Sequence, residues 1–285
     1  MSMTSNNLLV ELFVEELPPK ALKKLGESFA STLRDVLAAH GLAADDSLVT
    51  PYASPRRLAA HITQVLSQAA DKPVAQKLMP AAVGLDAAGQ ATPALLKKLA
   101  ALGADASAVA GLRRENDGKA EVLYLDNVMP GAKLAEGLQK ALEEAMARLP
   151  IPKVMTYQLD DGWSNVNFVR PVHGLVALHG ANVVPLTILG LASSNLTQGH
   201  RFEATRHPVM LKDADSYARQ LETEGAVIAS FAARRAEIVR QLAAAATKAG
   251  LTPIEDDALL DEVTALVERP NVLLGQFENE YLEVP

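Results

Sequence analysis

The stretch from residue 8 to residue 41 constrains the fold more than any other part of the sequence. It opens with LLVELFV at 8–14, a run rich in Leu and Val that is typical of a strand. Pro18 and Pro19 suit a first helical turn, and Gly41 suits the end of a helix. The apolar residues that recur between them at helical spacing are Leu22, Leu25, Phe29, Leu33, Val36 and Leu37. The stretch therefore predicts a strand followed by one long amphipathic helix.

The next hundred residues predict a mixture of elements. A strand entered through a proline turn is expected at 54–66, whereas 71–92 is interrupted by Ala, Gly and Pro and predicts a loop with little regular structure. Two helices are expected near 93–102 and 131–148. Between them, the Asn-Asp-Gly series within 115–118 predicts the tight turn of a hairpin.

The pattern of residues changes at residue 149, from helical spacing to clusters of strand-favouring residues. Residues that favour strands cluster over 149–211, and 180–182 suits a hairpin loop. Helical patterns return in three segments, 214–225, 227–250 and 256–270. A further strand is expected at 271–277. The predicted fold class is α+β, with a mixed β-sheet core, helices packed around it and a helical C-terminal segment, and without the regular β-α alternation of a doubly wound sheet.

Composition and missing motifs exclude several kinds of chemistry. The chain has no cysteine, which excludes disulfides, thiolate metal sites and cysteine nucleophiles and favours a cytosolic setting. No apolar run approaches the ~20 residues that cross a bilayer, and MSMTSNN does not resemble a secretory signal. The phosphate-loop, zinc-helix, dinucleotide and nucleophile-elbow motifs are all absent from the sequence. We therefore expect no catalysis by this chain alone and no resident cofactor.

The segment TQGHRFEATRHP at 197–208 stands out because it gathers cationic side chains in a chain with a net charge of −7. The surrounding residues 148–207 carry five Lys or Arg against three Asp or Glu, and four of the six histidines. Such a local cationic centre suits a surface that binds a polyanion. It equally suits a β-rich segment with few surface charges.

Histidines in this region allow a metal site to be considered. His173 and His179 are six residues apart on an expected strand, so they would share one face. His200, Glu203 and His207 could complete a cluster. The spacings match no ligand pattern, however, so the sequence does not favour a metal site.

Several arginines offer a more specific chemistry. Arg56 and Arg57 follow Pro55, Arg170 precedes Pro171, and Arg201 and Arg206 bracket Glu203. Guanidinium groups bind phosphate through paired hydrogen bonds, and neighbouring rigid residues partly fix their direction. The alternative for each arginine is an internal salt bridge or stacking on a neighbouring side chain.

The order of several stretches carries a more specific resemblance. The collinear stretches are LLVELFVEELPPKAL, SPRRLA, LPIPKVM, NFVRPVHGLVALHG, LTQGHRF and LLDEVTALVERPNVLLGQFE. In this order, from about residue 8 to the end, the chain resembles the β subunit of bacterial heterotetrameric glycyl-tRNA synthetase. The chain looks like an N-terminal fragment of such a subunit.

The resemblance implies a division of labour. A separate α chain would hold the catalytic core, use ATP with magnesium and activate glycine, and two α and two β chains would form the enzyme. The β chain would recognise and place glycine tRNA, in the cytoplasm and away from membranes. The portion 1–148 would be an N-terminal α+β portion resembling in part the editing-type domain of phenylalanyl-tRNA synthetase β chains. The β-rich portion 149–211 would pack on it, and the helical portion 212–285 would lead to HD-type and anticodon-binding domains.

With this resemblance, the cationic stretch is interpreted as an RNA contact. Gly199 would permit a turn and Phe202 would anchor the segment in the core. The predicted RNA-binding residues are Arg56, Arg57, Lys153, Arg170, His173, His200, Arg201 and Arg206, and no catalytic or metal-binding residue is predicted.

Two alternatives remain open at this point. His200 and Arg201 could instead pin a turn by hydrogen-bonding local carbonyls. The chain could also be a hydrolytic editing module acting on mischarged tRNA, with His200 or His173 as general base. A deep pocket with convergent amides would favour editing, and a shallow cationic groove would favour tRNA positioning.

Overall fold

The computed structural model describes residues 4–118, 120–278 and 280–281. Two parts of the predicted organisation lie outside the described residues. They are residues 1–3, within the N-terminal stretch MSMTSNN, and residues 282–285, at the end of the predicted helical portion. Contacts divide the chain into two compact units, Met1–Gln68 with Ala132–Pro285, and Ala69–Gly131. Both boundaries predicted from the sequence, at 148/149 and 211/212, fall inside the first unit, and the three portions stay predictions.

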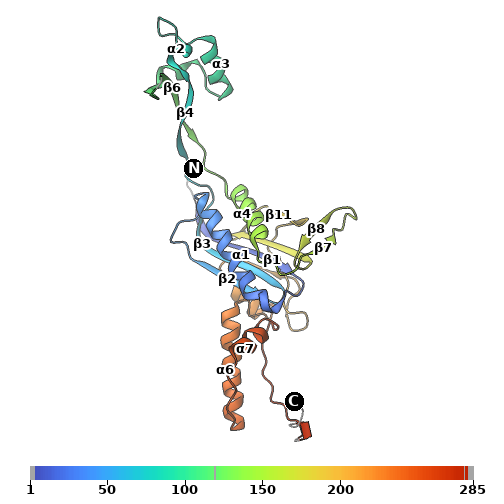
Figure 1. Ribbon diagram of the computed structural model, residues 1–285. Coiled ribbons are helices and arrows are strands. Elements are labelled where there is room, and N and C mark those ends of the chain that lie inside the picture. Colours follow the sequence, from blue (N-terminus) through green and yellow to red (C-terminus); the bar gives the residue numbers. More distant parts are fainter. Residues whose placement is uncertain (1–3, 119, 279, 282–285) are drawn as a thin grey trace. The chain divides into compact units, whose positions relative to one another are not determined.

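The first unit is built on one antiparallel sheet with the strand order β10-β9-β1-β3-β2 (Figure 1). The strands are β1 (Ser5–Val14), β2 (Val49–Ser54), β3 (Arg57–Leu66), β9 (Val172–His179) and β10 (Asn182–Val183). The combination of helices and strands is confirmed, but this sheet is antiparallel and not mixed. β1 is the central strand because its apolar run suits burial on both faces.

A long helix covers one face of this sheet. α1 (Pro19–Ala39) begins at the expected prolines, and Gly41, with φ +71°, follows its end. The helix lies close against β2, since a Cβ atom at Gly26 would lie 2.6 Å from the Cβ of Ala53. α4 (Leu134–Arg148) packs on α1. The amphipathic stripe read from the sequence therefore faces the sheet.

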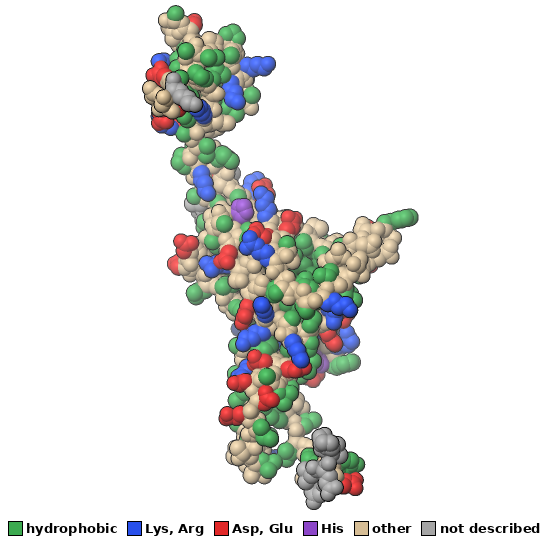
Figure 2. Space-filling model, viewed as in Figure 1, with side chains coloured by type: hydrophobic (Ala, Val, Ile, Leu, Met, Phe, Trp, Pro, Cys, Tyr) green, Lys and Arg blue, Asp and Glu red, His purple; other side chains and the backbone are tan. Residues whose placement is uncertain are grey.

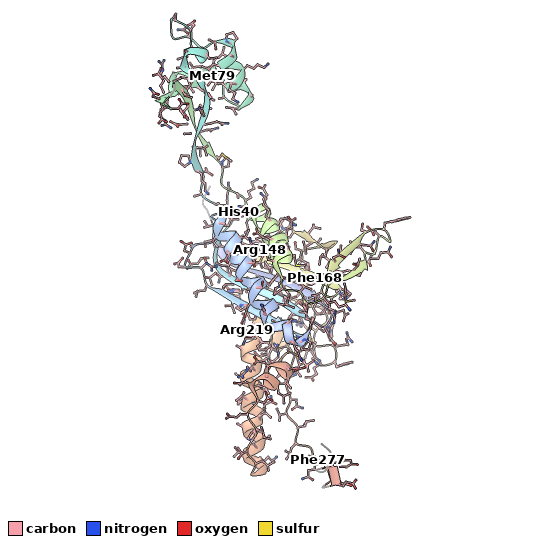
Figure 3. All side chains as sticks on the ribbon, viewed as in Figure 1. His40, Met79, Arg148, Phe168, Arg219 and Phe277 are labelled. Atoms are coloured by element: carbon pink, nitrogen blue, oxygen red, sulfur yellow. The ribbon has the colours of Figure 1, made fainter. Side chains whose placement is uncertain are left out.

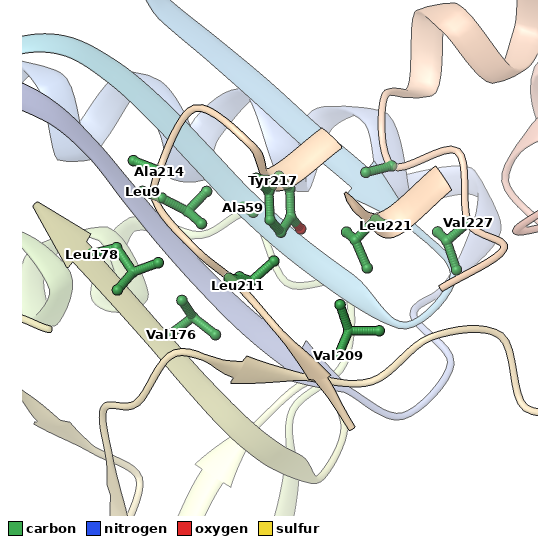
Figure 4. Packing of buried hydrophobic residues seen from close by; sticks show 11 residues of the cluster. Leu9, Ala59, Val176, Leu178, Val209, Leu211, Ala214, Tyr217, Leu221 and Val227 are labelled. Atoms are coloured by element: carbon green, nitrogen blue, oxygen red, sulfur yellow. The ribbon is translucent and has the colours of Figure 1, made fainter. Parts of the chain in front are cut away.

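The opposite face is covered by α5 (Tyr217–Thr223) and by the ribbon of β13 (Leu196–Thr197) and β14 (Val209–Met210). Figure 4 shows Leu9 and Val176 of the sheet packed with Tyr217 and Leu221 of α5. All four side chains are almost completely buried. Segments from the start and from the last third of the sequence therefore meet in one core.

Two small hairpins and two helices complete the first unit. The hairpins are β7 (Met155–Gln158) with β8 (Asn165–Phe168) and β11 (Thr187–Ile188) with β12 (Leu191–Ala192). Phe168, labelled in Figure 3, is buried at the base of the first hairpin. The helices are α6 (Phe231–Ala249) and α7 (Asp257–Thr264), and they confirm the predicted helical C-terminal segment.

The second unit contains the three-stranded sheet β4-β6-β5 and short helices. Its elements are β4 (Lys72–Pro80), α2 (Ala81–Gly84), α3 (Pro93–Ala101), η1 (Ala106–Gly111), β5 (Arg113–Asn116) and β6 (Glu121–Met129). The hairpin between β5 and β6 is confirmed, but the turn begins later than predicted, because Glu115 and Asn116 are the last residues of β5. The loop predicted for 71–92 is wrong, because most of β4 pairs with β6, some 50 residues away, and the ladder hydrogen bonds hold an Ala- and Pro-rich segment extended.

One further correction concerns the C-terminal segment. The described residues 271–277 form no strand, although their composition favours one. A strand requires a neighbour to complete its hydrogen bonds, and no sheet of the described chain includes this segment.

Across the described residues, no helix is both long enough and apolar enough to cross a bilayer.

Candidate functional site

The cationic stretch forms a loop between β13 and β14 that is fastened to the end of α5. The backbone N–H of His200 donates to the carbonyl oxygen of Gly225 at 2.7 Å. A Cβ atom at Gly199 would lie 2.5 Å from that same oxygen. Gly199 is therefore needed for close approach of two backbones, and its φ is not in the left-handed region.

His200 stabilises the turn that follows it. Its Nδ1 atom accepts hydrogen bonds from the backbone N–H groups of Phe202 and Glu203 at 3.3 and 3.2 Å. Because Nδ1 accepts, the neutral ring carries its proton on Nε2. His200 thus pins the turn as one alternative expected, although through amide donors and not through carbonyls.

Phe202 differs from the prediction. The structure leaves 85% of this side chain exposed, so its predicted anchoring in the core is wrong. The small side chain of Ala204 takes the inward position, since its Cβ lies 2.7 Å from where a Cβ of Gly199 would be. Arg201, next to Phe202, is exposed and has no side-chain partner among the described residues.

These residues border an open groove of about 250 Å³. The segment 266–269 after α7 and the β2–β3 turn form its other sides. Arginines outnumber carboxylates in its lining. The charged and imidazole side chains that line it are Glu16, Arg56, His200, Arg201, Glu268 and Arg269.

The two adjacent arginines at the β2–β3 turn differ in burial. Arg56 is half-buried beside the groove, with its guanidinium carbon 4.7 Å from the centre of the Phe13 ring. Arg57 is completely buried. Its Nη2 donates to the carbonyl oxygen of Gln198 at 2.7 Å and lies 3.6 Å from Glu268 Oε1. The direct RNA contact predicted for Arg57 is inconsistent with this burial.

Arg57 belongs to a buried polar network beneath the groove. Glu11, fully buried on β1, accepts hydrogen bonds from the hydroxyl groups of Thr197 and Tyr217. Burial alone would lower the pKa of Arg57, but Glu11, together with Tyr217 and Glu268, outweighs it and raises the pKa above its ordinary value. The network therefore keeps Arg57 charged and fixes the start of the cationic loop.

Ion pairs hold two more cations, Arg269 in the groove lining and Arg206 outside it. Arg206 Nε lies 3.6 Å from Glu224 Oε2, and Arg269 Nη1 lies 3.0 Å from Glu203 Oε2. Arg206 and Arg269 are more than half exposed in these pairs. Exposed pairs of this kind contribute about 0–1 kcal/mol, so both arginines remain available to a stronger anion.

The other predicted residues occupy different surroundings. Arg170 donates from Nε to the carbonyl oxygen of Glu16 at 3.0 Å, which ties it to one wall of the groove. His173 Nε2 lies 3.1 Å from Glu15 Oε1 on the surface. Lys153 is exposed just before β7. Neither Lys153 nor His173 is among the groove residues.

The histidines considered for a metal site have separate partners. His173 pairs with Glu15, and the buried His179 lies 2.7 Å from the carbonyl oxygen of Val65 through Nε2. Within the described residues, no group of three or more His, Asp or Glu side chains is placed to hold a metal ion.

The groove also contains residues that the sequence did not single out as contacts. Phe202 presents an aromatic face, and Arg269 adds a third arginine. The position of Arg269 directly before Pro270 was a usable signal, since the same reasoning selected Arg170 before Pro171. No local signal places 266–269 opposite the cationic loop.

Comparison with known proteins shows the family that this chain resembles. The family model described as glycyl-tRNA synthetase beta subunit matches residues 8–285. Proteins named glycine–tRNA ligase beta subunit from Janthinobacterium sp. (strain Marseille) and Leptothrix cholodnii are 70% and 72% identical to the chain. Each alignment covers 99% of this chain but only 41% and 40% of the relative. The chain thus spans about two fifths of the length of the curated relatives it matches.

Proposed function

The chain belongs to the glycyl-tRNA synthetase beta subunit family, and from this premise we propose that it recognises and positions glycine tRNA for glycylation. The bond-making chemistry would reside in a separate α chain that uses ATP with magnesium. Two α and two β chains would assemble in the cytoplasm. This chain would contribute binding and orientation, and would hold no cofactor of its own.

The groove is the observation that supports this proposal most directly. Arg201 is unpaired among the described residues, Arg56 and Arg269 flank the same space, and Phe202 is exposed beside them. Guanidinium groups suit ribose–phosphate oxygens, and the Nε2–H of His200 adds a further donor. An A-form stem is recognised through its shallow minor groove and phosphates, while an unpaired base stacks on an aromatic ring. An open groove with a few fixed donors fits both needs.

The editing alternative receives less support from the same geometry. A general base needs an unprotonated nitrogen that faces water. In His200 that nitrogen is Nδ1, which already accepts two backbone hydrogen bonds. His173 pairs with Glu15 away from the groove. The resemblance to the editing-type domain of phenylalanyl-tRNA synthetase β chains is therefore proposed as a likeness of fold, with tRNA placement as the work.

Footprinting of glycine tRNA tests the proposal. Hydroxyl-radical cleavage would be compared for tRNA alone, with this chain, and with this chain plus the α chain. We expect protection of a short ribose–phosphate tract by this chain, and loss of that protection in the variant Arg201→Ala. Asp46→Ala, at an exposed carboxylate outside the groove, is the control. Equal cleavage in all samples would contradict the proposal.

A further inference from the structure

The single tryptophan of the chain lies in an unusual position. Trp163 is at the tip of the β7–β8 hairpin, and 88% of its side chain is exposed. Val154 and Met155, on the first arm, are also exposed, at 56% and 38%. The hairpin projects from the sheet of the first unit (Figure 1), and Figure 2 shows hydrophobic atoms at its outer end. Leaving so large an apolar surface in water is unfavourable, because burial of an aromatic side chain contributes strongly to the stability of cores and interfaces.

The tip holds its shape through local hydrogen bonds. Asp161 Oδ1 accepts from the backbone N–H groups of Trp163 and Ser164 at 2.9 and 2.8 Å. Gln158 Nε2 donates to the carbonyl oxygen of Gly162 at 2.6 Å, and Gly162 takes a φ of +73° that the turn requires. The backbone that carries Trp163 is therefore fixed before any partner arrives, which lowers the entropic cost of binding.

The arms of the hairpin are fixed as well. Tyr157 Oη accepts from the backbone N–H of Val172 at 3.2 Å. Leu159 lies directly against Gly190, where a Cβ atom would come within 2.5 Å of its Cδ1. Gln139 of α4 holds β11 through two hydrogen bonds with the backbone of Thr187, at 2.8 and 3.0 Å. The hairpin is thus braced against the rest of the first unit.

Charge around the tip distinguishes the kind of partner. Residues 154–169 contain Asp160 and Asp161 and no lysine or arginine, and residues 182–199 contain no charged side chain. The flanking Lys153 and Arg170 lie at the base of the hairpin, where Met155 pairs with Phe168 and Arg170 Nη1 lies 3.3 Å from Met155 Sδ. Binding of single-stranded nucleic acid combines aromatic stacking with a cationic path for the backbone. Here the carboxylates would repel phosphate. A protein pocket edged by cations would instead be attracted to them.

We propose that the β7–β8 hairpin docks through Trp163 into an apolar pocket of a partner polypeptide whose rim carries lysine or arginine. Under the proposed function, on which this choice of partner rests, that polypeptide is the α chain. Trp163 is the anchor, because tryptophan is enriched among the residues that dominate interface energies. Asp160, which bears no hydrogen bond within the described tip, supplies the electrostatic match.

The single tryptophan gives a direct test. This chain is labelled with 5-fluorotryptophan, so that one fluorine resonance reports Trp163, and is mixed with unlabelled α chain or with glycine tRNA. The α chain should shift or broaden the resonance, and tRNA alone should leave it unchanged. A resonance that moves only with tRNA, or with neither, overturns the proposal. Failure of the α chain to bind overturns it too, while the tRNA footprint still tests the proposed function independently.

Variants sharpen the result. Trp163→Ala should weaken binding of the α chain roughly thirty-fold, and Trp163→Phe should recover part of that loss. Asp160→Lys should weaken it about five-fold at low salt. The matched control is Phe202→Ala, which removes another strongly exposed aromatic ring and should leave α-chain binding unchanged. Tighter binding of tRNA by Asp160→Lys with unaltered α-chain binding would assign the tip to RNA and refute docking.

Discussion

Two aromatic side chains of the first unit are exposed almost equally, Phe202 at 85% and Trp163 at 88%, yet their surroundings have opposite charge. Phe202 lines the groove whose three arginines, Arg56, Arg201 and Arg269, outnumber its two carboxylates. Trp163 lies beside Asp160 and Asp161, with no cation in its hairpin. Both are proposed as contact residues, and the neighbouring charge is what distinguishes the class of partner proposed for each.

The two regions also differ in what supports them. The groove rests on buried ionic groups, above all Arg57, whose guanidinium lies between Gln198 and Glu268. The hairpin rests mainly on apolar packing, with Phe168 buried and Leu159 packed on Gly190, and the guanidinium of Arg170 contacts Met155 at its base. Removing the buried Arg57 should therefore destabilise the protein strongly, whereas removing the exposed ring of Trp163 at the tip should change its stability little.

The largest expected effect is at Arg57. Arg57→Met leaves Glu11 buried without its cation, and removing one member of a buried charged set costs about 3–5 kcal/mol of unfolding free energy. Urea denaturation measures this. Trp163→Ala, the comparison at the tip, should stay within about 0.5 kcal/mol of the parent. An Arg57→Met protein with unchanged stability but weaker tRNA binding would restore the contact role that burial argues against.

The next effect separates the two aromatic rings. Phe202→Ala should weaken tRNA binding by about 1–3 kcal/mol, because base stacking on an aromatic face is worth that much. Filter binding at fixed salt gives the value. Trp163→Ala is the matched control and should bind tRNA like the parent. Equal losses in both variants would remove the distinction between groove and tip.

A smaller effect is expected at Arg201. Arg201→Ala should lower tRNA affinity by about 1 kcal/mol and reduce the slope of log affinity against log salt by about one, as expected for one lost phosphate contact. Arg201→Lys should keep most of the slope. Lower thermal stability with an unaltered slope would show that Arg201 serves the fold instead.

The smallest effect concerns pH at the tip. Hydrogen bonds from the side chain and backbone of Ser164, and from the N–H of Trp163, lower the pKa of Asp161 below its ordinary value. The charged carboxylate therefore stabilises the turn above its ordinary pKa, and this support is lost as pH falls through the lowered value. The fluorine resonance of Trp163 should broaden as the pH falls through that lowered pKa.

Asp161→Asn provides the control for that titration. An asparagine oxygen accepts the same two backbone hydrogen bonds without titrating, so the broadening should disappear. If the variant broadens over the same range, the transition belongs to another group of the hairpin.

The sequence predicted the parts of the fold that depend on local periodicity. The stripe containing Leu22 and Phe29 placed α1 correctly, because spacing along a helix is a property of the segment itself. The segment 71–92 was misjudged because β4 gains its order from β6, a distant neighbour. The prediction for the segment 271–277 was wrong in the opposite sense: its composition suits a strand, but no neighbouring strand of the described chain pairs with it.

The site was predictable in outline and not in detail. Clustered cations located the loop at 197–208, but adjacent arginines look alike in a sequence. Pairing of Arg57 with Ser54 at the start of β3 turns its side chain to the same face as Ala59, into the core. Phe202 was expected inside because it is aromatic, yet the close contact of Gly199 with Gly225 leaves room there only for Ala204.

A photo-crosslinking amino acid placed at position 202 or at position 163 gives the most direct measurement. The benzophenone analogue of phenylalanine would be introduced at each position in turn, and the chain irradiated in the presence of both glycine tRNA and the α chain. Adducts with RNA from position 202 and with polypeptide from position 163 are the predicted result. RNA adducts from position 163, or polypeptide adducts alone from position 202, would contradict the claim that neighbouring charge assigns each exposed ring its partner.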